Sequence, residues 1–240
     1  FLLSPYLQKK SFVQIGCFLK MISDLNLNAI PKKIFDYCIV GAGPAGITLA
    51  INLAKQKKTV LLAEGGGLNW QRDASRTLQG QVIGDEYFSL ENSRLKLFGG
   101  TSGHWTGMCR PLDDLDFKFL DNHWPITKKD LEPFLEESCK ILEIPNKFED
   151  RLLSSTHGIK SIDFQFSPPV RFGSKYFKAI KESENIYVSL NSNLVNLEFN
   201  NKTIKTACFK SFNKRSAYVN AGKFILTTGG IENSRLLKWI

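Results

Sequence analysis

The clearest hydrophobic pattern in the chain lies between residues 34 and 64, where two apolar runs flank an amphipathic segment. Residues 34–40 are strand formers interrupted only by Asp36, a pattern typical of a strand buried on both faces. Residues 59–63 form the second apolar run. The segment between them places four apolar residues on one helical face: Ile47, Ala50, Leu53 and Ala54. The pattern therefore predicts a strand, a helix and a second strand, which together form a βαβ unit.

Hydrophobic periodicity predicts further elements along the rest of the chain. An amphipathic helix is expected after residue 126, capped by Thr127 or Asp130. Its apolar stripe comprises Leu131, Phe134, Leu135, Cys139, Ile141 and Leu142. A second helix is expected over residues 175–182, and a third begins at residue 231. Short apolar runs predict strands at 186–190, 194–199, 203–209, near 217–219, and at 223–227.

A glycine motif joins the first strand of the βαβ unit to its helix. The spacing G-x-G-x-x-G is formed by Gly41, Gly43 and Gly46, with Ala42, Pro44 and Ala45 between them. The first glycine permits a tight turn, the second lets the backbone approach a pyrophosphate, and the third lets the helix pack on the strand. Proline suits the first turn of a helix. The motif and its flanking elements predict a dinucleotide site; an ordinary βαβ unit without a nucleotide is the alternative.

Glu64 ends the second strand roughly 20 residues after Gly41, where a carboxylate accepts hydrogen bonds from an adenosine ribose. An acid here argues against a 2′-phosphate and therefore against NADP. The alternative is a solvated carboxylate at a strand end. Three glycines follow at residues 65–67. We expect them to form a flexible exit that keeps side chains away from the adenosine end of a ligand, with Gly65 beside it.

A second glycine-rich stretch covers residues 98–111 and combines four glycines with small hydroxyl residues, one histidine and one tryptophan. The backbone of such a loop can lie against a flat ring. Arg94 lies just before it. Its guanidinium could neutralise a pyrophosphate bidentately, or it could pair with an acid at the surface. No histidine supports Cys109 as a thiolate, so we expect a small buried residue there.

Composition and charge exclude several classes of function. The chain has 240 residues, is 42% hydrophobic and carries a formal net charge of +9. Its lysines are scattered, which argues against nucleic-acid binding. Five cysteines form no C-x-x-C pair and three histidines have no ligand spacing, so we expect a reduced, metal-free, cytoplasmic protein. No stretch is long enough to span a membrane, although an amphipathic membrane contact by residues 1–20 is an alternative.

The predicted order is a βαβ unit, an excursion, a β-meander, and a strand that ends in Thr228, Gly229 and Gly230. We expect an α/β fold of the FAD-binding Rossmann-like type, as in flavoproteins with two dinucleotide-binding domains. The predicted FAD-binding domain comprises residues 33–120 and 185–240, and residues 121–184 form an inserted helical segment of a substrate region. Residues 1–32 are expected to be an N-terminal extension, with Met21 as a plausible native start.

Five segments carry a resemblance to the glucose-methanol-choline (GMC) oxidoreductases, especially bacterial members close to pyranose 2-oxidase. They are DYCIVGAGPAGITLA, LLAEGGG, SRLKLFGGTSGHWTGMCRPLDDLDF, WPITKKDLEPF and FILTTGGIENSRLL. The resemblance covers the chain from about Met21 onward. It implies FAD as cofactor and oxidation of an alcohol or sugar hydroxyl, with hydride transfer to flavin N5.

The resemblance also implies roles for individual residues. It places residues 41–46 at the FAD pyrophosphate, with Thr228 and Gly229 close to it, Glu64 on the adenosine ribose, and Leu194 beside the adenine. The residues implied to lie beside the isoalloxazine ring are Gly99, Gly100, Thr101 and Ser102.

His104 and Thr106 carry the most specific implications of the resemblance. Similar pyranose oxidases have GGMSTHW at this place, and their histidine is bonded covalently to the flavin. The alternative for His104 is a histidine that packs or hydrogen-bonds near the flavin. Thr106 matches a threonine at the reactive edge of the ring, and the alternative is a simple loop hydroxyl. We expect Trp105 to pack rather than to react.

The family's catalytic base is a histidine near the C-terminal end, which has no counterpart within these 240 residues. His123 and His157 match no catalytic motif. We therefore expect the N-terminal portion of a longer enzyme that cannot turn over alone. A short non-catalytic flavin-binding module is the second hypothesis, and a FAD- or NAD-dependent dehydrogenase of another family is the third. The substrate alcohol or sugar, the electron acceptor (oxygen, a quinone or a cytochrome) and the oligomeric state stay open.

Overall fold

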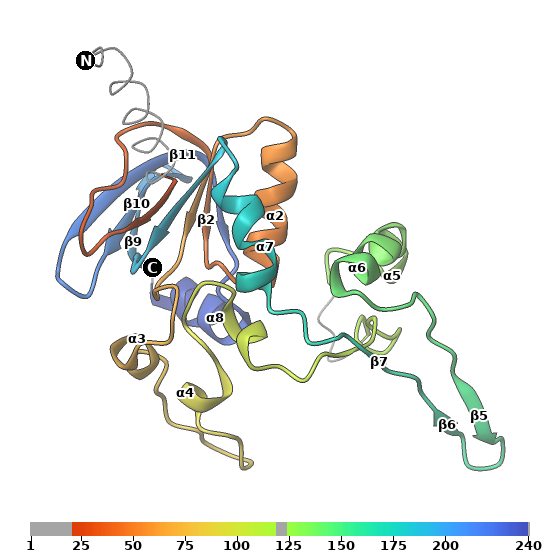
Figure 1. The fold of residues 1–240 in the computed structure, drawn as a ribbon. Helices are drawn as coiled ribbons and strands as arrows, with labels where there is room; N and C mark the ends of the chain where they lie inside the picture. Colours follow the sequence, from red (N-terminus) through yellow and green to blue (C-terminus); the bar gives the residue numbers. More distant parts are fainter. Residues whose placement is uncertain (1–20, 119–123, 240) are drawn as a thin grey trace, which may run out of the picture. The chain divides into compact units, whose positions relative to one another are not determined.

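A computed structural model describes residues 21–118 and 124–239, and the chain divides into two compact units (Figure 1). The first unit comprises residues 21–103 and 171–239, and the second comprises residues 104–170. The sequence-based division placed the boundaries at residues 120 and 184 instead. Cys17 and His123, and the expected extension at residues 1–20, lie outside the described residues.

The first unit contains a seven-stranded sheet with the order β1-β8-β3-β2-β11-β10-β9. β2, β3, β8 and β1 are parallel to one another, and β11 joins β2 in the same direction. β9 and β10 add an antiparallel meander. The strands are β1 (Ile22–Asp24), β2 (Phe35–Val40), β3 (Val60–Ala63), β8 (Ile186–Leu190), β9 (Asn193–Asn200), β10 (Thr203–Lys210) and β11 (Ser216–Leu226). The predicted α/β fold, with its βαβ unit and β-meander, is confirmed.

β11 changes its pairing partner halfway along its length. Residues 216–220 pair antiparallel with β10, and residues 221–226 pair parallel with β2. The prediction of two separate strands here was wrong, because the polar residues between the two apolar runs stay extended within a single strand. Gly222 lies at the changeover, where an added Cβ would approach the carbonyl oxygen of Asp36 at 3.1 Å. The single strand therefore links the meander rigidly to the centre of the sheet.

The segment before residue 33 contributes to this sheet. Ile22–Asp24 forms the edge strand β1, paired parallel with β8. Leu25 and Ile30 follow it into the core, at 1% and 6% exposure. This differs from the expected N-terminal extension over residues 1–32. The three-residue strand is too short for periodicity to reveal, and its stability depends on the neighbouring strand.

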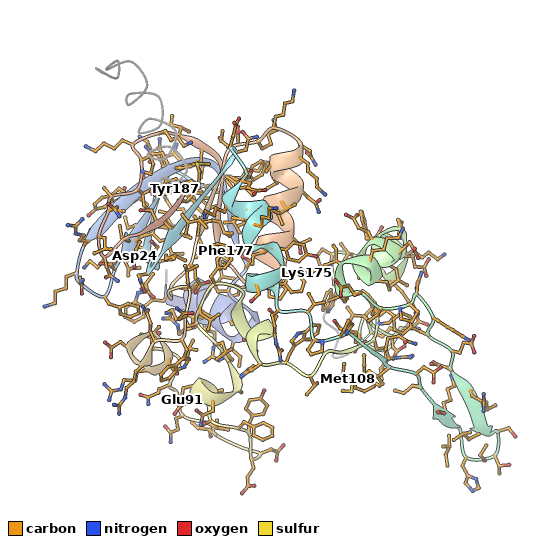
Figure 2. All side chains as sticks on the ribbon, in the orientation of Figure 1. Asp24, Glu91, Met108, Lys175, Phe177 and Tyr187 are labelled. Carbon is orange, nitrogen blue, oxygen red and sulfur yellow. The ribbon has the colours of Figure 1, made fainter. Side chains whose placement is uncertain are left out.

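Two helices cover one face of the parallel strands (Figure 1). α2 (Pro44–Lys55) begins with proline in its first turn and buries Ile47, Ala50 and Leu53. α7 (Phe172–Lys181) packs beside it, and its Phe177 meets Phe98 edge to face at a ring distance of 6.2 Å (Figure 2). The unit's other helices are α3 (Arg72–Arg76), α4 (Leu90–Ser93), the 3-10 helix η1 (Gly100–Gly103) and α8 (Gly230–Trp239).

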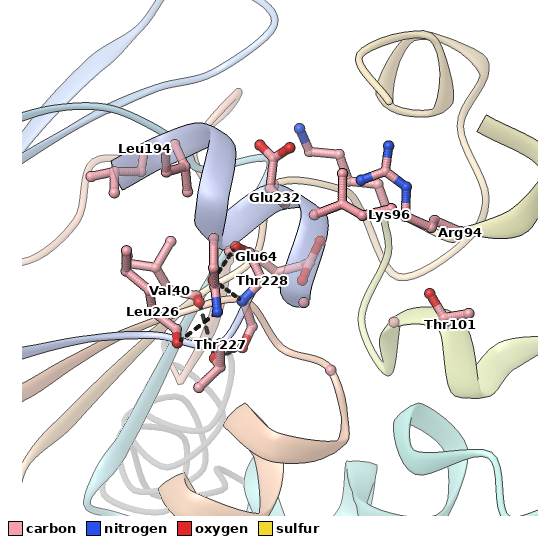
Figure 3. A pocket seen from close by; sticks show the side chains of 18 of the residues that line it. Val40, Glu64, Arg94, Lys96, Thr101, Leu194, Leu226, Thr227, Thr228 and Glu232 are labelled. Atoms are coloured by element: carbon pink, nitrogen blue, oxygen red, sulfur yellow. Dashed lines mark hydrogen bonds between the residues drawn. The ribbon is translucent and has the colours of Figure 1, made fainter. Parts of the chain in front are cut away.

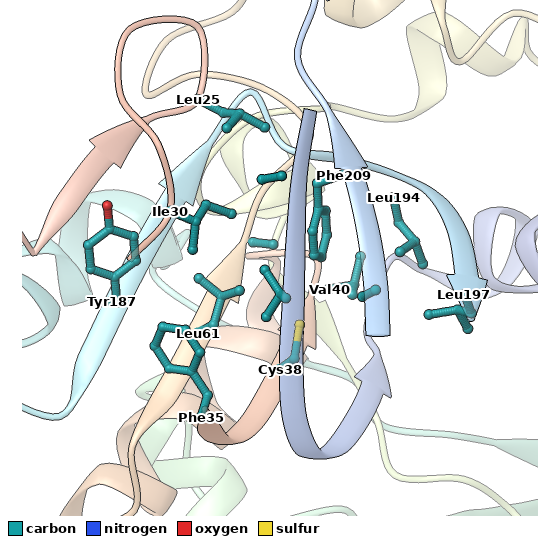
Figure 4. Packing of buried hydrophobic residues seen from close by; sticks show 14 of the residues in the cluster. Leu25, Ile30, Phe35, Cys38, Val40, Leu61, Tyr187, Leu194, Leu197 and Phe209 are labelled. Carbon is teal, nitrogen blue, oxygen red and sulfur yellow. The ribbon is translucent and has the colours of Figure 1, made fainter. Parts of the chain in front are cut away.

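The meander covers the opposite face of the parallel strands (Figure 4). Cys38, Val40 and Leu61 from the parallel strands pack with Leu194 and Phe209 from the meander. Successive residues of a strand point to opposite faces, so the residues between them, such as Ile39 and Leu62, belong to the helical face. Both faces of β2 and β3 are therefore buried, as their nearly continuous apolar sequences require.

The second unit is built from short elements. α5 (Lys128–Leu131), the 3-10 helix η3 (Glu132–Phe134) and α6 (Leu135–Leu142) follow one another directly. Of the two predicted caps, Thr127 is the N-cap of α5, and Asp130 completes a capping box with it. The single predicted helix is divided into α5, η3 and α6. Two small ribbons pair β4 (Met108–Cys109) with β7 (Gln165–Phe166), and β5 (Arg151–Ser154) with β6 (Ile159–Ser161). Sequence periodicity did not predict these ribbons.

Candidate dinucleotide-binding site

A cavity of about 700 Å³ opens in the first unit at the carboxyl ends of the parallel strands (Figure 3). Its walls come from the segments that directly follow β2, β3, β8 and β11, and from residues 94–101. β2 lies between β3, which follows it in the chain, and β11, which returns from far downstream. In open α/β sheets, ligands bind at the carboxyl ends of two adjacent strands whose following connections run to opposite sides of the sheet. The cavity volume lies within the usual range for small-molecule sites, about 300–1,000 Å³.

Gly41 and Gly46 are required by close packing in the turn after β2. Gly41 has φ = +104°, and a Cβ there would lie 2.7 Å from the carbonyl oxygen of Thr227. A Cβ at Gly46 would overlap the carbonyl oxygen of Gly41. Gly41 thus makes the turn and Gly46 lets α2 approach it, which are the roles that a dinucleotide turn gives these positions.

The side-chain direction of Gly43 is open, because a Cβ added there would have nothing within 4 Å. It caps the N-terminus of α2 and lines the cavity together with Pro44 and Ala45. A helix N-terminus presents free backbone N–H groups and a partial positive charge, which suit a phosphate. The open space over Gly43 is therefore a cradle that a diphosphate can fill.

Glu64 is buried at 5% exposure and lines the cavity, so it is not a solvated carboxylate at a strand end. Its Oε2 accepts a hydrogen bond from the Ala42 N–H at 2.9 Å, and its Oε1 accepts one from the Gly66 N–H at 2.9 Å. Burial raises the pKa of Glu64, and the two backbone hydrogen bonds oppose this shift. Each carboxylate oxygen has a further lone pair, which can accept a ribose hydroxyl.

Threonine and asparagine side chains fix the end of β11 against the turn. Thr227 Oγ1 donates to the carbonyl oxygens of Gly41 at 2.7 Å and Val40 at 3.0 Å (Figure 3). Asn233, in the first turn of α8, accepts hydrogen bonds from the N–H and hydroxyl of Thr228 at 3.0 and 2.6 Å. Gly229 follows with φ = +89° and open space around it. These contacts hold the start of α8 at the cavity.

The second glycine-rich stretch lies against the first. Gly99 has φ = +99°, and its N–H donates to the Ala42 carbonyl at 2.8 Å. A Cβ at Gly100 would lie 3.0 Å from the Cα of Gly43. Thr101 Oγ1 accepts a hydrogen bond from the Leu95 N–H at 3.2 Å. Ser102 is buried and bridges the Gly99 carbonyl and the Phe172 N–H, so it fixes the loop to α7.

Arg94 and Lys96 bring positive charge to the cavity wall. Arg94 donates to the carbonyl oxygens of Leu90 at 3.2 Å and Leu78 at 2.8 Å. Among the described residues it forms no ion pair, which argues against the surface-acid alternative. Lys96 donates to Thr77 Oγ1 at 2.8 Å. Its pKa is lowered by burial, against the attraction of Glu232 and Glu64.

The run of three glycines after Glu64 serves close packing rather than flexibility. A Cβ at Gly65 would overlap the side chain of Lys96, and a Cβ at Gly66 would overlap the Lys96 carbonyl. Gly67 accepts a hydrogen bond from the Phe98 N–H at 2.9 Å. These glycines let residues 94–98 pack directly on the end of β3. The expectation that they form a flexible exit was therefore wrong.

The structure brings most of the sequence-predicted cofactor residues to one cavity. Those that line it are Gly41, Gly43, Pro44, Ala45, Glu64, Gly65, Arg94, Gly100, Thr101, Leu194, Thr228 and Gly229. Ala42, Gly46, Gly99 and Ser102 lie behind this wall and hold it in place through the contacts above. His104 and Thr106 are exposed and belong to the second unit, so their predicted contacts with a flavin stay predictions.

Sequence reasoning missed several residues of the cavity. They are Lys96, Asn193, Thr227, Glu232, Asn233 and Arg235. Glu232, in the first turn of α8, and Arg235, in the second, form a bidentate ion pair at 2.6 and 3.0 Å. The motif FILTTGGIENSRLL contained a signal, since polar residues just after a Gly-Gly turn lie in the first turn of a helix that starts at a strand end.

Other kinds of site find no support in the described part of the chain. No group of three potential metal ligands occurs there, and no helix is long and apolar enough to span a bilayer. Four cysteines are free thiols. Burial raises the pKa of Cys38 to about 12 and is the main cause that raises the pKa of Cys208 to about 11. No described cysteine lines the cavity.

Comparisons with known proteins agree with this geometry. The family model described as "Pyridine nucleotide-disulphide oxidoreductase" matches residues 35–238. Pyridoxine 4-oxidase from Mesorbium loti shares the fold with a TM-score of 0.53 and 20% identity, covering 83% of this chain and 50% of its own. A variant of formate oxidase from Aspergillus oryzae, studied for FAD modification, has a TM-score of 0.52 and 19% identity, covering 87% and 48%. This chain thus spans about half the length of these structures. No curated protein matches it by sequence.

Proposed function

Because the chain belongs to the pyridine nucleotide-disulphide oxidoreductase family and has the fold of a FAD-dependent oxidoreductase domain, we propose that it is the FAD-binding part of an enzyme that oxidises an alcohol or sugar CH–OH group. Within this proposal it is a GMC-type flavoprotein, as the motifs that resemble that family indicate. Both structural neighbours are oxidases. The rest of the enzyme, including a base that takes the hydroxyl proton, is proposed to lie on a C-terminal continuation.

The observation that carries the proposal is the cradle at the end of β2. Gly43 leaves open space at the N-terminus of α2, and Glu64 lies on the same wall of the cavity. The diphosphate of FAD is proposed to lie over Gly43, with the adenosine ribose at Glu64 and the adenine beside Leu194. When bound, FAD supplies the hydride acceptor of the reaction. This chain's own residues bind and orient it.

The loop at Gly100 and Thr101 is proposed to orient the flavin ring. Its backbone lies against Gly43, and its conformation is fixed by Ser102 and by the hydrogen bond between Thr101 and the Leu95 N–H. A rigid wall beside the ring would hold one face of the flavin in place. Thr106 at the reactive edge and a covalent bond to His104 belong to the proposal on the strength of the motif alone.

Disulphide reduction with NADH or NADPH is the second candidate, because the family's description names it. The cysteines disfavour it. A redox disulphide requires a thiolate of low pKa next to a partner thiol, whereas burial raises the pKa values of the described thiols here. None of the described cysteines lines the cavity. The CH–OH oxidoreductase is therefore the better proposal.

Cofactor binding is tested first on the 240-residue chain. Purified protein is titrated with FAD, and quenching of flavin fluorescence gives the Kd. We expect saturable binding, a weaker response to FMN, and loss of binding in Gly43→Val, which fills the cradle. Lys55→Val, at the other end of α2, is the control, because Lys55 is exposed and does not line the cavity. Absence of FAD binding by the unaltered chain would refute the proposal.

The reaction is tested on the enzyme with its continuation recovered from the gene. Flavin bleaching is followed anaerobically with a panel of alcohols and sugars and, separately, with NADH and NADPH. Bleaching by a CH–OH donor alone supports the proposal, and bleaching by a nicotinamide followed by reduction of a disulphide supports the second candidate. Acid precipitation then separates bound from free flavin, with His157→Ala as the control for His104→Ala. A supernatant that keeps all the yellow colour would exclude a covalent bond.

A further inference from the structure

Lys96 lines the cavity, and the proposed function assigns no role to it. Its side chain lies across Gly65, since a Cβ at Gly65 would overlap Lys96 Cε and lie 3.3 Å from Lys96 Nζ. Gly65 directly follows Glu64, so the ammonium lies at the end of the cavity assigned to the adenosine ribose. Thr77 Oγ1 accepts its hydrogen bond at 2.8 Å and itself donates to the Ala74 carbonyl at 2.7 Å. The ammonium is therefore held in place from outside the cavity.

Two carboxylates face this ammonium. Glu64 is buried at 5% exposure, and the side chain of Glu232 is 14% exposed (Figure 3). Both attract Lys96, whereas Arg94 and Arg235 repel it. All five side chains line the same cavity. A dinucleotide that enters brings two further negative charges on its diphosphate, so carboxylates in a partly desolvated cavity would repel it unless cations offset them.

We propose that Lys96 is a cofactor-positioning residue that selects the adenosine diphosphate half of the ligand, because its ammonium offsets Glu64 and Glu232. The inference rests on the proposed function in one respect, namely that the ligand is FAD. With Lys96 in place, Glu64 can accept the ribose hydroxyls as a carboxylate while the diphosphate lies nearby over Gly43. Without Lys96, Glu64 loses the cation nearest to it, whereas Glu232 keeps its ion pair with Arg235.

The position of Lys96 also predicts which part of the ligand depends on its ammonium for binding. The flavin ring is assigned to the other end of the cavity, at Gly100 and Thr101. FMN carries one phosphate and no adenosine ribose, so its affinity should depend on the ammonium less than that of ADP. ADP reproduces the half of FAD that lies beside it. ADP and FMN are therefore the two probes that separate this inference from a general loss of structure.

The experiment measures Kd values for ADP and FMN in five proteins: the unaltered chain, Lys96→Met, Lys96→Arg, Lys58→Met and the double variant Lys96→Met/Glu232→Gln. Lys58 is exposed and remote from the cavity lining, which makes it the matched control. We expect Lys96→Met to weaken ADP binding on the order of 30-fold, as is typical when one partner of a desolvated charge group is truncated. FMN affinity should fall less, because FMN carries one phosphate and no adenosine ribose. Lys96→Arg retains most of the ADP affinity, and Glu232→Gln restores part of it in the Lys96→Met background.

The pH dependence of ADP affinity is a second test, because a purely structural role of Lys96 would not change it. Burial lowers the pKa of Lys96 from its ordinary 10.5, and a bound diphosphate favours the charged ammonium. ADP affinity should therefore fall at alkaline pH below 10.5 in the unaltered chain. The same fall should be absent in Lys96→Arg, because guanidinium stays charged.

Gly65→Ala tests the same ammonium without removing the lysine. Its Cβ would displace the Lys96 side chain, so ADP affinity should fall in the unaltered background and stay constant in the Lys96→Met background. If Lys96→Met fails to fold, the alkaline fall of ADP affinity in the unaltered chain and its absence in Lys96→Arg decide the case. Equal ADP affinity in Lys96→Met and unaltered protein, with FAD still bound, would overturn the inference and leave the proposed function standing. An unaltered chain that binds neither FAD nor ADP would overturn both.

Discussion

The two units of this chain are stabilised by different means. The first buries an apolar cluster around Phe209, which is fully buried. The second gathers around Arg110, whose side chain is 10% exposed and which bonds Asp113, Asp150 and the carbonyl oxygen of Asp163. The first unit should therefore resist salt and acid, and the second should respond to both.

The second unit also exposes much apolar surface. Its strands β5 and β7 present Leu153 at 63% and Phe166 at 65% exposure. Among its described residues, the buried apolar side chains are Cys139, Ile144 and Val170. Apolar surface of this extent is unusual for a monomeric protein and typical of a surface that something else covers. The comparison teaches that the cavity is built on an apolar core, whereas the second unit depends on polar contacts.

Replacing one phenylalanine in each unit, buried in the first and exposed in the second, gives the largest expected difference. Phe209→Ala removes a fully buried ring and should lower the free energy of unfolding by about 3–5 kcal/mol. Phe166→Ala is the matched change in the second unit, and its exposed ring should cost under about 0.5 kcal/mol. Urea denaturation followed by circular dichroism measures both. Similar losses from the two changes would mean that the second unit has an apolar core of its own.

Replacing one glycine by alanine in each unit tests whether the turn after β2 determines FAD affinity. Gly46→Ala places Cβ on the Gly41 carbonyl, so the turn must shift. We expect a loss of about 1–3 kcal/mol in stability and a fall of FAD affinity on the order of 100-fold. In the β5–β6 ribbon, Gly158 has φ = +64° and open space around it.

Gly158→Ala is thus the control for Gly46→Ala, because its cost is conformational alone. It should lower stability by about 1 kcal/mol and leave the Kd for FAD unchanged. Fluorescence titration and thermal unfolding give the two numbers. Unchanged FAD affinity in Gly46→Ala would contradict the assignment of this turn to the diphosphate.

These contrasts also explain what the sequence could predict. Residues 34–64 combine a strong apolar period with the G-x-G-x-x-G spacing, so the βαβ unit and the glycine turn after β2 were predictable. β1 was not, because three residues carry no period and depend on pairing with β8. Lys96 and Asn233 were missed for a related reason, since their roles arise from side chains that the fold brings together from distant segments. A local sequence pattern does not show which distant side chains the fold brings into contact.

Breaking the guanidinium network should loosen the second unit selectively. Arg110→Met removes hydrogen bonds to two carboxylates and should cost about 2 kcal/mol, seen as faster amide exchange in residues 104–170. Arg110→Lys should recover only part of this, because an ammonium lacks the planar fork. Exchange in residues 34–64 should not change. Equal acceleration in both units would contradict their independent stabilisation.

Acid should have the same selective effect. The hydrogen bond from Arg110 holds the pKa of Asp113 below its ordinary 3.8. A carboxyl with a lowered pKa stabilises the folded state above its unfolded value, and that contribution is lost as pH falls through the lower folded value. Amide exchange in residues 104–170 should therefore accelerate below pH 3.8 in the unaltered chain, and Arg110→Met should lack this Asp113-dependent step. Retention of the step in Arg110→Met would assign it to another carboxyl.

The smallest effect is expected where one hydroxyl joins β11 to the turn after β2. Thr227→Val keeps the shape of the side chain and removes its hydrogen bonds to the Gly41 and Val40 carbonyls. Those carbonyls lose a side-chain partner, so stability should fall by about 1 kcal/mol and FAD affinity roughly fivefold. Thr156→Val, at an exposed turn position of the second unit, is the control and should change neither quantity. If Thr227→Val lowers stability but not affinity, the hydroxyl supports the sheet alone and the turn keeps its cradle without it.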